Sequence, residues 1–485
     1  MLALETFRPR WSEPIGELPI PHVVIDRERV LVINQAAAVS GVRIGMRRGG
    51  VAAISPGISM HERDAAREQA AWDSVALTLL QYTPEVALAQ EDSLLLDVSA
   101  SLRAFGGLLR LCRLVRASVL TLGFTPQLGV APTAQGAWLL ARYRPGRSRA
   151  RQRRVLRMPQ LIMRLDALPC SLLPAARPYH DWLHGIGCRT LGAMRKLPRA
   201  GLLRRCDKDM LQALDCAYGE APELFVWVEA PQSFSVRLEL PDRIDYAEAL
   251  LFAARRLIVQ MIGWLVALQL AVSHFVLSLE HERGRVAIAP TPLEIMLAEP
   301  AWHEEHLIRL LKERLGRLEL CAPVIAIRLD AARVSAMLPP NESLFPEPGG
   351  TAADFHRLLE LLTARLGNDS VLAPAPQADH RPEICNAWLP VATTRFSLAA
   401  DQAAIERPFW LLEKPIALTM RNNRPFYGSP LKLICGPERI EAGWWDGALV
   451  ARDYFIAQGS EAACYWVYRE RAKQEAGWFL QGLFA

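Results

Sequence analysis

The 485-residue sequence lacks paired cysteines. Its nine cysteines are scattered singly, and no two of them are spaced as Cys-x-x-Cys. This argues against a disulfide framework and against a cysteine zinc site, and it suits a reducing cytoplasm. The chain also lacks the His-Glu-x-x-His zinc motif, because His303 and His306 are only three residues apart. We interpret these histidines, and the pair His180 and His184, as helix residues and expect no metal at either place.

A secretory signal is also missing from the start of the sequence, where Met1 is followed by Leu-Ala-Leu-Glu rather than by a basic and then apolar segment. One stretch, residues 257–279, carries no charged residue and is long enough to span a bilayer. Polar residues such as Gln260 and Gln269 interrupt it, and its second half alternates in polarity as a strand does. We therefore predict a buried helix that runs into a strand, with no membrane contact.

The composition is that of a folded protein with several domains: 51% of the residues are hydrophobic, 22% are charged and the net charge is +5. The positive charge is unevenly placed. Guanidinium groups pair well with phosphates, so an arginine run predicts a nucleic-acid contact, the alternative being a solvated linker without a partner. Eight arginines form such a run without any acidic residue among them: Arg142, Arg144, Arg147, Arg149, Arg151, Arg153, Arg154 and Arg157.

Asp92 lies in a β-prone stretch, Glu91-Asp92-Ser93 followed by three leucines, which predicts a strand that carries carboxylates. A two-metal phosphoryl-transfer site needs several hard oxygen ligands, and Ser93 offers no charge to a divalent ion. Taken alone, the stretch is better explained as the acidic edge of a strand.

Turn and periodicity signals predict mixed α/β structure for residues 18–140 and a β-α-β-β-α-β order, the ferredoxin-like split unit, for residues 233–330. In the first segment we expect a hairpin at 23–33, helices at 60–80 and after Gly107, and a short strand at 127–131 before another helix. In the second we expect strands at 234–240, 270–279, 285–289 and 324–329, and helices at 246–268 and 302–318. We expect a further helix near residues 354–366. We expect the last hundred residues to form a tryptophan-rich module of short strands.

The stretch from Leu183 to Leu191 resembles the hairpin of a helix-hairpin-helix motif. In such hairpins a Gly-x-Gly turn exposes backbone N–H groups at a helix N-terminus, where a DNA phosphate can bind. The candidate DNA-binding residues are Gly185, Ile186, Gly187 and Arg189.

A palm with fingers, a helix-hairpin-helix thumb and a little finger, in this order, resemble the Y-family translesion DNA polymerases. The strings that carry the resemblance are Gly41–Met46, Leu96–Ser99, Phe105–Gly107 and Gly129–Thr133. The resemblance implies a multidomain α+β fold: palm and fingers at 1–141, an Arg-rich linker at 142–165, a thumb at 166–232, a little finger at 233–332, a second linker at 333–385 and a β-rich C-terminal module at 386–485.

The departures from the family pattern all fall at positions that bind the metal ions or the incoming nucleotide. Active relatives open with an Asp-x-Asp-x-Phe strand, and the alignment puts Ala3 at its first metal-ligand position. At the second metal site only Asp92 remains, since Ser93 replaces a glutamate. The family residues that contact the incoming triphosphate are replaced by Gln35, Ala38 and Ala134. The resemblance therefore implies little or no catalysis, because phosphoryl transfer depends on positioning and charge neutralisation.

A sequence that keeps the Y-family scaffold but lacks most of its catalytic residues is similar to the ImuB family. ImuB is the Y-family-like subunit of a bacterial SOS-induced mutagenesis complex. Four C-terminal strings add to this resemblance: Pro408–Leu412, Gly436–Gly447, Arg452–Phe455 and Gly477–Phe484. The family implies an adaptor without a cofactor. It would bind primer-template or single-stranded DNA, the β sliding clamp, a RecA-like ImuA-type protein and an error-prone C-family (DnaE-type) polymerase.

The clamp-binding candidate is the segment Asn341–Phe345, in which Leu344 and Phe345 would fill an apolar pocket and Asn341 stands where the family peptide has glutamine. In the alternative interpretation this apolar pair packs on the chain's own surface.

Two other functions remain open from the sequence. An active polymerase could use a rebuilt Mg²⁺ site of Glu91, Asp92 and Asp97, although alternation along a strand would point Asp92 and Asp97 to opposite faces. An assembly factor that never touches DNA would show no salt-dependent DNA binding. The pair Trp444 and Trp445 could stack on a single-stranded base, but we favour aromatic packing within the β module.

Overall fold

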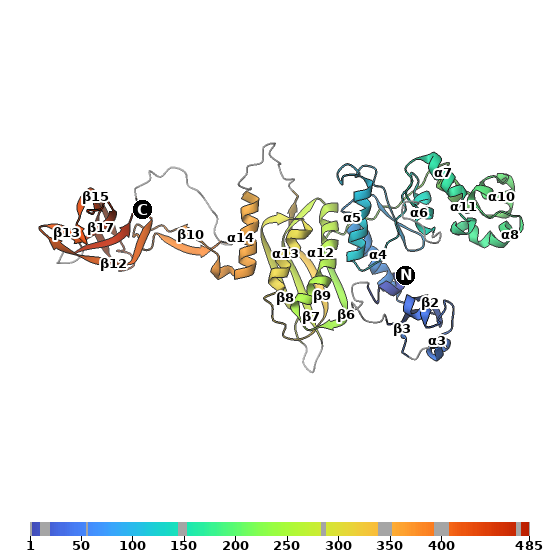
Figure 1. Ribbon diagram of the computed structural model, residues 1–485, viewed down its shortest axis with the longest axis horizontal. Coiled ribbons are helices and arrows are strands. Elements are labelled where there is room, and N and C mark those ends of the chain that lie inside the picture. Colours follow the sequence, from blue (N-terminus) through green and yellow to red (C-terminus); the bar gives the residue numbers. More distant parts are fainter. Residues whose placement is uncertain are drawn as a thin grey trace. The chain divides into compact units, whose positions relative to one another are not determined.

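The computed structural model describes residues 2–9, 20–54, 57–143, 153–282, 288–337, 352–391, 407–471 and 477–484. The chain forms two compact units, residues 1–353 and 354–485, and the fold is multidomain α+β as predicted (Figure 1). Residues 354–385, which the sequence analysis placed in a linker, belong to the second unit.

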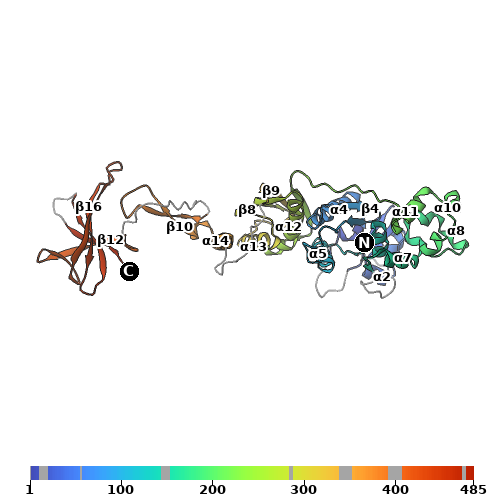
Figure 2. The same ribbon diagram turned by 90° about the horizontal axis from the view of Figure 1, so that it is seen from above.

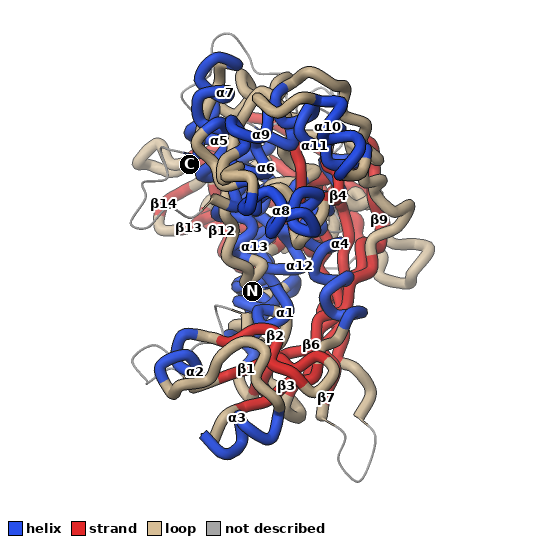
Figure 3. The backbone as a smooth tube through the Cα atoms, turned by 90° about the vertical axis from the view of Figure 1, so that its right-hand side faces the viewer, coloured by secondary structure: helices blue, strands red, loops and turns tan. Residues whose placement is uncertain are grey.

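The first sheet has the strand order β2-β1-β3, in which β1 (His22–Asp26) is antiparallel to β2 (Arg29–Ile33) and parallel to β3 (Ser59–Glu62). Arg27 and Glu28 have φ angles of 48° and 65°, the two left-handed residues of a type I′ turn. The predicted hairpin is therefore confirmed. Two short helices, α2 (Gln35–Val39) and α3 (Arg48–Ile54), flank this sheet (Figure 3).

Residues Leu2–Glu5 form a short helix, α1, at the place where the active relatives have their opening strand. The Thr6 hydroxyl donates to the Ala3 carbonyl at 2.9 Å and closes this turn. Ala3 is buried with Leu4 and Val24 beneath the first sheet. Ala3 is thus a packing residue, and it does not face a carboxylate site.

A second layer contains the antiparallel hairpin of β4 (Val86–Ala89) and β5 (Ser93–Leu96), with α4 (Ala65–Leu79) and α5 (Leu108–Thr121) packed together in one core. The helix predicted for residues 60–80 begins only at Ala65, because Met60 belongs to β3 and the Asp64 side chain caps the helix. The strand expected at 127–131 is reduced to a single β-bridge between Val130 and Arg154.

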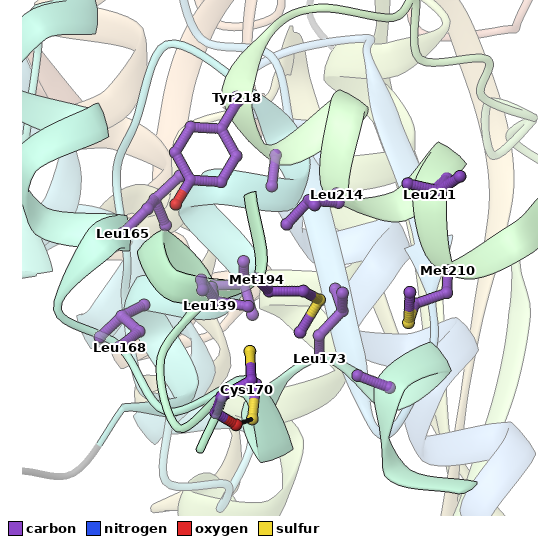
Figure 4. Packing of buried hydrophobic residues seen from close by; sticks show 14 of the residues in the cluster. Leu139, Leu165, Leu168, Cys170, Leu173, Met194, Met210, Leu211, Leu214 and Tyr218 are labelled. Atoms are coloured by element: carbon purple, nitrogen blue, oxygen red, sulfur yellow. Dashed lines mark hydrogen bonds between the residues drawn. The ribbon is translucent and has the colours of Figure 1, made fainter. Parts of the chain in front are cut away.

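The described helices between Ala134 and Tyr218 form a group with one buried core, part of which Figure 4 shows. Within this core the Tyr218 hydroxyl donates to Asp166 at 2.7 Å. Burial and this hydrogen bond raise the pKa of Tyr218. The helices are α6 (Ala134–Arg142), α7 (Met158–Asp166), α8 (His180–Gly185), α9 (Leu191–Arg195), α10 (Arg199–Arg205) and α11 (Lys208–Tyr218).

The predicted β-α-β-β-α-β order is present and forms a four-stranded antiparallel sheet with the order β6-β9-β7-β8. Each helix joins two parallel strands that are separated by a third, so two split β-α-β units interleave. The elements are β6 (Ser235–Ile244), α12 (Leu250–Ala267), β7 (Leu270–His281), β8 (Thr291–Ala301), α13 (Glu304–Leu315) and β9 (Val324–Ala336). The strand expected at 285–289 is wrong in position: β7 continues to His281 and pairs Leu279 with Thr291, so β8 starts later.

Among the described residues, one helical segment, Ala247–Ala267, which contains α12, is long and apolar enough to cross a membrane, but 72% of its most apolar window is buried inside the fold. It packs directly against α4 (Figure 2), where a Cβ added to Gly263 would lie 2.1 Å from the Leu77 carbonyl oxygen. The Trp264 indole donates to the Pro231 carbonyl at 2.6 Å. The predicted buried helix is confirmed.

The second unit begins with α14 (Ala352–Leu366), followed by the hairpin of β10 (Leu372–Pro376) and β11 (Asn386–Pro390). Its main sheet has the order β14-β13-β12-β18-β17-β16-β15. Arg381, beside the hairpin, pairs with Asp446 at 2.6 Å and so ties the hairpin to this sheet. The sheet strands are β12 (Trp410–Arg421), β13 (Arg424–Tyr427), β14 (Ser429–Pro430), β15 (Lys432–Ala442), β16 (Val450–Gln458), β17 (Cys464–Glu470) and β18 (Trp478–Leu483).

Candidate functional site

Asp92 lies in the turn between β4 and β5, so the expectation that a strand carries it is wrong. The hairpin pairs Ala89 with Ser93, which leaves residues 90–92 as the turn, and Glu91 and Asp92 have φ angles of 53° and 51°. The left-handed conformation is disfavoured for most residues, and short polar residues such as aspartate tolerate it best. Asp92 is exposed, and no ion pair joins it to another described residue.

Glu91 is held by two arginines. Its carboxylate accepts hydrogen bonds from both terminal nitrogens of Arg177, and Arg142 lies 3.2 Å away. The hydrogen bond from Arg177, and then the charge of Arg142, hold the pKa of Glu91 below its usual range. A divalent ion would have to displace both guanidinium groups, so Glu91 acts as a structural anion that joins the turn to two helical segments.

Asp97 does not complete a metal site with these residues. It follows the last residue of β5, is exposed, and accepts a hydrogen bond from the Ser99 N–H at 2.9 Å within its own turn. Across the described residues, no group of three or more His, Cys, Asp or Glu side chains could hold a metal ion. The rebuilt carboxylate site therefore lacks the convergence of ligands that a Mg²⁺ site needs.

A different carboxylate, Glu223, occupies the N-terminus of α6. It accepts hydrogen bonds from the Ala134 N–H at 2.8 Å and the Gln135 N–H at 2.7 Å, while the Thr133 hydroxyl caps Gly136. The first N–H groups of a helix are a natural binding place for an anion, and here the chain supplies its own. Sequence reasoning missed Glu223 because it lies 89 residues beyond Ala134 and carries no local signal.

A cavity of about 750 Å³ brings several of the predicted positions together. Asp92 and Ser93 contribute to its wall together with Ala134 and Glu223. Glu91 and Asp97 also line the cavity, and most of the remaining lining is apolar. Of the other positions at which the sequence departs from the polymerase pattern, Gln35 and Ala38 are exposed on α2 beside the first sheet, and Ala3 is buried beneath that sheet. None of these three lines the cavity.

The arginine run is described only at its two ends. Arg142 ends α6, where it pairs with Glu91 and lies over the Trp138 ring at 5.0 Å. Arg153 and Arg154 run beside Val130, whose N–H donates to the Arg153 carbonyl at 2.9 Å, and Arg157 is the N-terminal cap residue of α7. These ends are anchored to the first unit. Arg144, Arg147, Arg149 and Arg151 lie outside the described residues.

The glycine hairpin between α8 and α9 is present, but its N–H groups are largely used within the turn. The N–H groups of Ile186 and Gly187 donate to the Trp182 and His184 carbonyls at 3.1 and 3.0 Å. The expectation that this turn leaves these donors free for a phosphate is therefore wrong. Gly185, Ile186, Gly187 and the Arg189 side chain are all exposed, so a DNA contact here would rely on Arg189.

Two further candidate positions can be placed. Trp444 and Trp445 are 71% and 54% exposed and contact each other edge to face, with Arg381 above the Trp445 ring at 5.5 Å. The interpretation that this pair packs inside the β module is therefore wrong. The predicted clamp-binding residues Asn341, Leu344 and Phe345 lie outside the described residues.

Comparison with known proteins agrees with the sequence resemblance. The impB/mucB/samB family model matches residues 18–142. Protein ImuB from two strains of Caulobacter vibrioides, NA1000 / CB15N and ATCC 19089 / CIP 103742 / CB 15, is in each case 23% identical over 473 residues, which cover 92% of this chain and all of the relative.

Two solved structures are similar at a lower level. A ternary complex of Dbh is 17% identical with a TM-score of 0.37, and it covers 67% of this chain and 94% of its own. DinB from Sulfolobus solfataricus is 16% identical with a TM-score of 0.35, and it covers 64% of this chain and 91% of its own. Together, the impB/mucB/samB match at residues 18–142 and the similarity to ImuB over 92% of the chain support an ImuB-family homologue of the Y-family DNA polymerases.

Proposed function

We propose that the protein is a non-catalytic, DNA-binding adaptor in SOS-induced translesion synthesis, and that it recruits an error-prone polymerase to clamp-loaded DNA at damage. The observation that supports this most directly is the state of the three acidic residues around β5. Asp92 is exposed in a turn, Glu91 is held by Arg142 and Arg177, and Asp97 bonds within its own turn. Metal-assisted phosphoryl transfer needs several carboxylates placed around the metal ions, and no three such side chains among the described residues are close enough together to hold a metal ion.

The helix N-terminus of α6 supports the same proposal. Glu223 uses the N–H groups of Ala134 and Gln135 that an incoming triphosphate could otherwise approach. A phosphate group near this point would meet a negative carboxylate instead of free donors, and the repulsion would weaken nucleotide binding.

DNA binding in this proposal is sequence-independent and electrostatic. The contacts would come from the arginine run at 142–157 and from Arg189 at the glycine hairpin. Of these residues, Arg157 and Arg189 are exposed, and Arg142, Arg153 and Arg154 are partly exposed. Phosphate contacts of this kind release counterions, so the affinity falls steeply as salt is added.

The partners follow from the family resemblance and belong to the proposal. They are the β sliding clamp, which would bind Leu344 and Phe345, a RecA-like ImuA-type protein and a DnaE-type polymerase that performs the synthesis. The proposal places this assembly in the cytoplasm, without a cofactor or membrane contact.

The test is primer extension by the purified chain on damaged and undamaged templates with Mg²⁺ or Mn²⁺, with DNA binding measured in the same samples over a salt series. The proposal expects salt-sensitive binding without incorporation. Incorporation that disappears in an Asp92→Ala variant would show an active polymerase and would contradict the adaptor. A clamp pull-down with the Leu344→Ala/Phe345→Ala variant tests the recruitment step: the variant should lose the clamp while retaining DNA.

A further inference from the structure

The outer face of α5 carries three arginines in one helical stripe. Arg110, Arg113 and Arg116 are three residues apart, so they follow one another along the same side of the helix at intervals of about 4.5 Å. All three are exposed, whereas Leu111 and Val115 on the opposite side are buried in the core. Figures 1 and 2 show α5 at the surface of the first unit.

These guanidinium groups have no acidic partner. No described carboxylate forms an ion pair with Arg110, Arg113 or Arg116, and none is available along the neighbouring chain, because no acidic residue occurs between Asp97 and Asp166. The same interval contains thirteen arginines. Like charges three residues apart destabilise a helix, so this spacing is unfavourable without a negatively charged partner.

Other surface arginines of the first unit behave differently. Arg48 pairs with Glu62 at 2.6 Å, Arg63 with Glu68 at 2.9 Å, and Arg255 with Glu304 at 2.8 Å. These three arginines are neutralised by a carboxylate, whereas the stripe on α5 has no such partner and forms a local positive field that attracts polyanions.

We propose that the α5 basic face, defined as Arg110, Arg113, Arg116 and the exposed Leu109 that precedes them, binds the sugar-phosphate backbone of duplex DNA. Arginine forks match phosphate oxygens, and a regular row of them fits a regular row of phosphates. The face is separate from the predicted contacts at 142–157 and at the glycine hairpin, and it rests on the proposed DNA-binding function.

The side chains of this face favour a duplex over other polyanions. Surfaces for single-stranded DNA combine cations with aromatic rings on which bases stack, and the described outer face of α5 carries no aromatic residue. Protein interfaces have an apolar centre, and here Leu109, 59% exposed, is the one large apolar side chain among the four residues.

The test compares two triple variants of the full chain. Arg110→Gln/Arg113→Gln/Arg116→Gln removes the stripe with a residue that favours helix, and Arg48→Gln/Arg63→Gln/Arg255→Gln removes the same charge from ion-paired positions. Binding of a fluorescent 30-base-pair duplex is followed by anisotropy over a salt series, with circular dichroism as the check on folding.

Each phosphate contact contributes about 0.9 to the slope of log affinity against log salt. We expect the α5 variant to lose about 2 to 3 from this slope and at least about tenfold in affinity at low salt, while the control variant keeps a slope close to that of the parent chain. Equal slopes in the two variants would contradict DNA binding by the α5 basic face and would leave the proposed function intact. A parent chain without salt-dependent DNA binding would contradict both proposals.

A labelled polyglutamate peptide completes the experiment. If the α5 variant lost binding of this peptide while its duplex binding stayed unchanged, the face would be assigned to an acidic protein and the proposal would be wrong.

Discussion

Glu91 accepts hydrogen bonds from Arg177, a residue 86 positions further along the chain, and the pair joins the β4–β5 turn to the helical group. The carboxylate next to the one retained aspartate of the polymerase pattern is therefore committed to structure. A side chain whose oxygens are shared by two arginines is fixed in place and loses most of its capacity to bind a cation.

Glu91→Gln should lower the free energy of unfolding by about 0.5–1.5 kcal/mol at pH 7, since it removes a partly buried charge pair. The pKa of Glu91 is lowered in the folded protein, so its contribution is present above its unfolded pKa of about 4.3 and is lost as pH falls through the lower folded value. Urea unfolding should therefore show a larger difference from the parent chain at pH 7 than at pH 3.5. Glu62→Gln, which breaks the exposed pair with Arg48, is the control and should change little; equal effects from the two variants would contradict the structural role of Glu91.

The element order was predictable because periodicity and turn residues are local signals. The β1–β2 hairpin, the helix after Gly107 and the β-α-β-β-α-β segment all followed from them. The position of Asp92 in a turn was not predictable, because a β-prone sequence does not reveal that its first two residues, Glu91 and Asp92, adopt left-handed conformations. The contacts that define the site join residues far apart in the chain, such as Glu223 with Ala134, and only the folded backbone brings them together.

Glu223→Ala should lower the free energy of unfolding by about 1 kcal/mol, the usual loss for a side-chain cap at a helix N-terminus. The reason is that the N–H groups of Ala134 and Gln135 lose their acceptor. Chemical denaturation followed by circular dichroism measures the change. Glu229→Ala removes an exposed carboxylate from the same segment and should be nearly neutral; a comparable loss there would argue against the capping role.

Gly263→Ala should destabilise the first unit by more than about 2 kcal/mol, because a new methyl group would collide with the backbone of α4. The added Cβ would lie 2.1 Å from the Leu77 carbonyl oxygen and 2.8 Å from the Thr78 Cα. Gly201→Ala is the matched control, since its Cβ meets nothing within 4 Å and α10 should gain about 0.5–1 kcal/mol. The midpoints of urea unfolding should therefore move in opposite directions, and a fall in both would show a general intolerance of alanine.

His22 and His61 should make the first sheet less stable as the pH falls below about 6.5. Their ring nitrogens lie 3.3 Å apart, and burial, then the Arg8 guanidinium, lowers the pKa of each. The unfolded chain takes up protons that the folded chain refuses, so stability decreases by up to about 1.4 kcal/mol per pH unit for each proton. Melting temperatures between pH 8 and pH 5.5 should fall in the parent chain and much less in His22→Gln/His61→Gln. An unchanged slope in the double variant would assign the pH dependence to other groups.

Trp466→Ala should cost the second unit about 3–5 kcal/mol, whereas Trp444→Ala should change its stability by less than about 0.5 kcal/mol. Trp466 is 2% exposed and stacks on the Tyr454 ring at a centroid distance of 4.1 Å, so its removal leaves a cavity in the sheet core. Trp444 instead projects into solvent and contacts Trp445 edge to face. Urea unfolding followed by circular dichroism separates the two outcomes without relying on tryptophan fluorescence. A large loss for Trp444→Ala would mean that this residue is part of the core after all. An unchanged stability of the Trp444→Ala variant would mean that the Trp444 side chain contributes little to folding and that its indole is available to a partner.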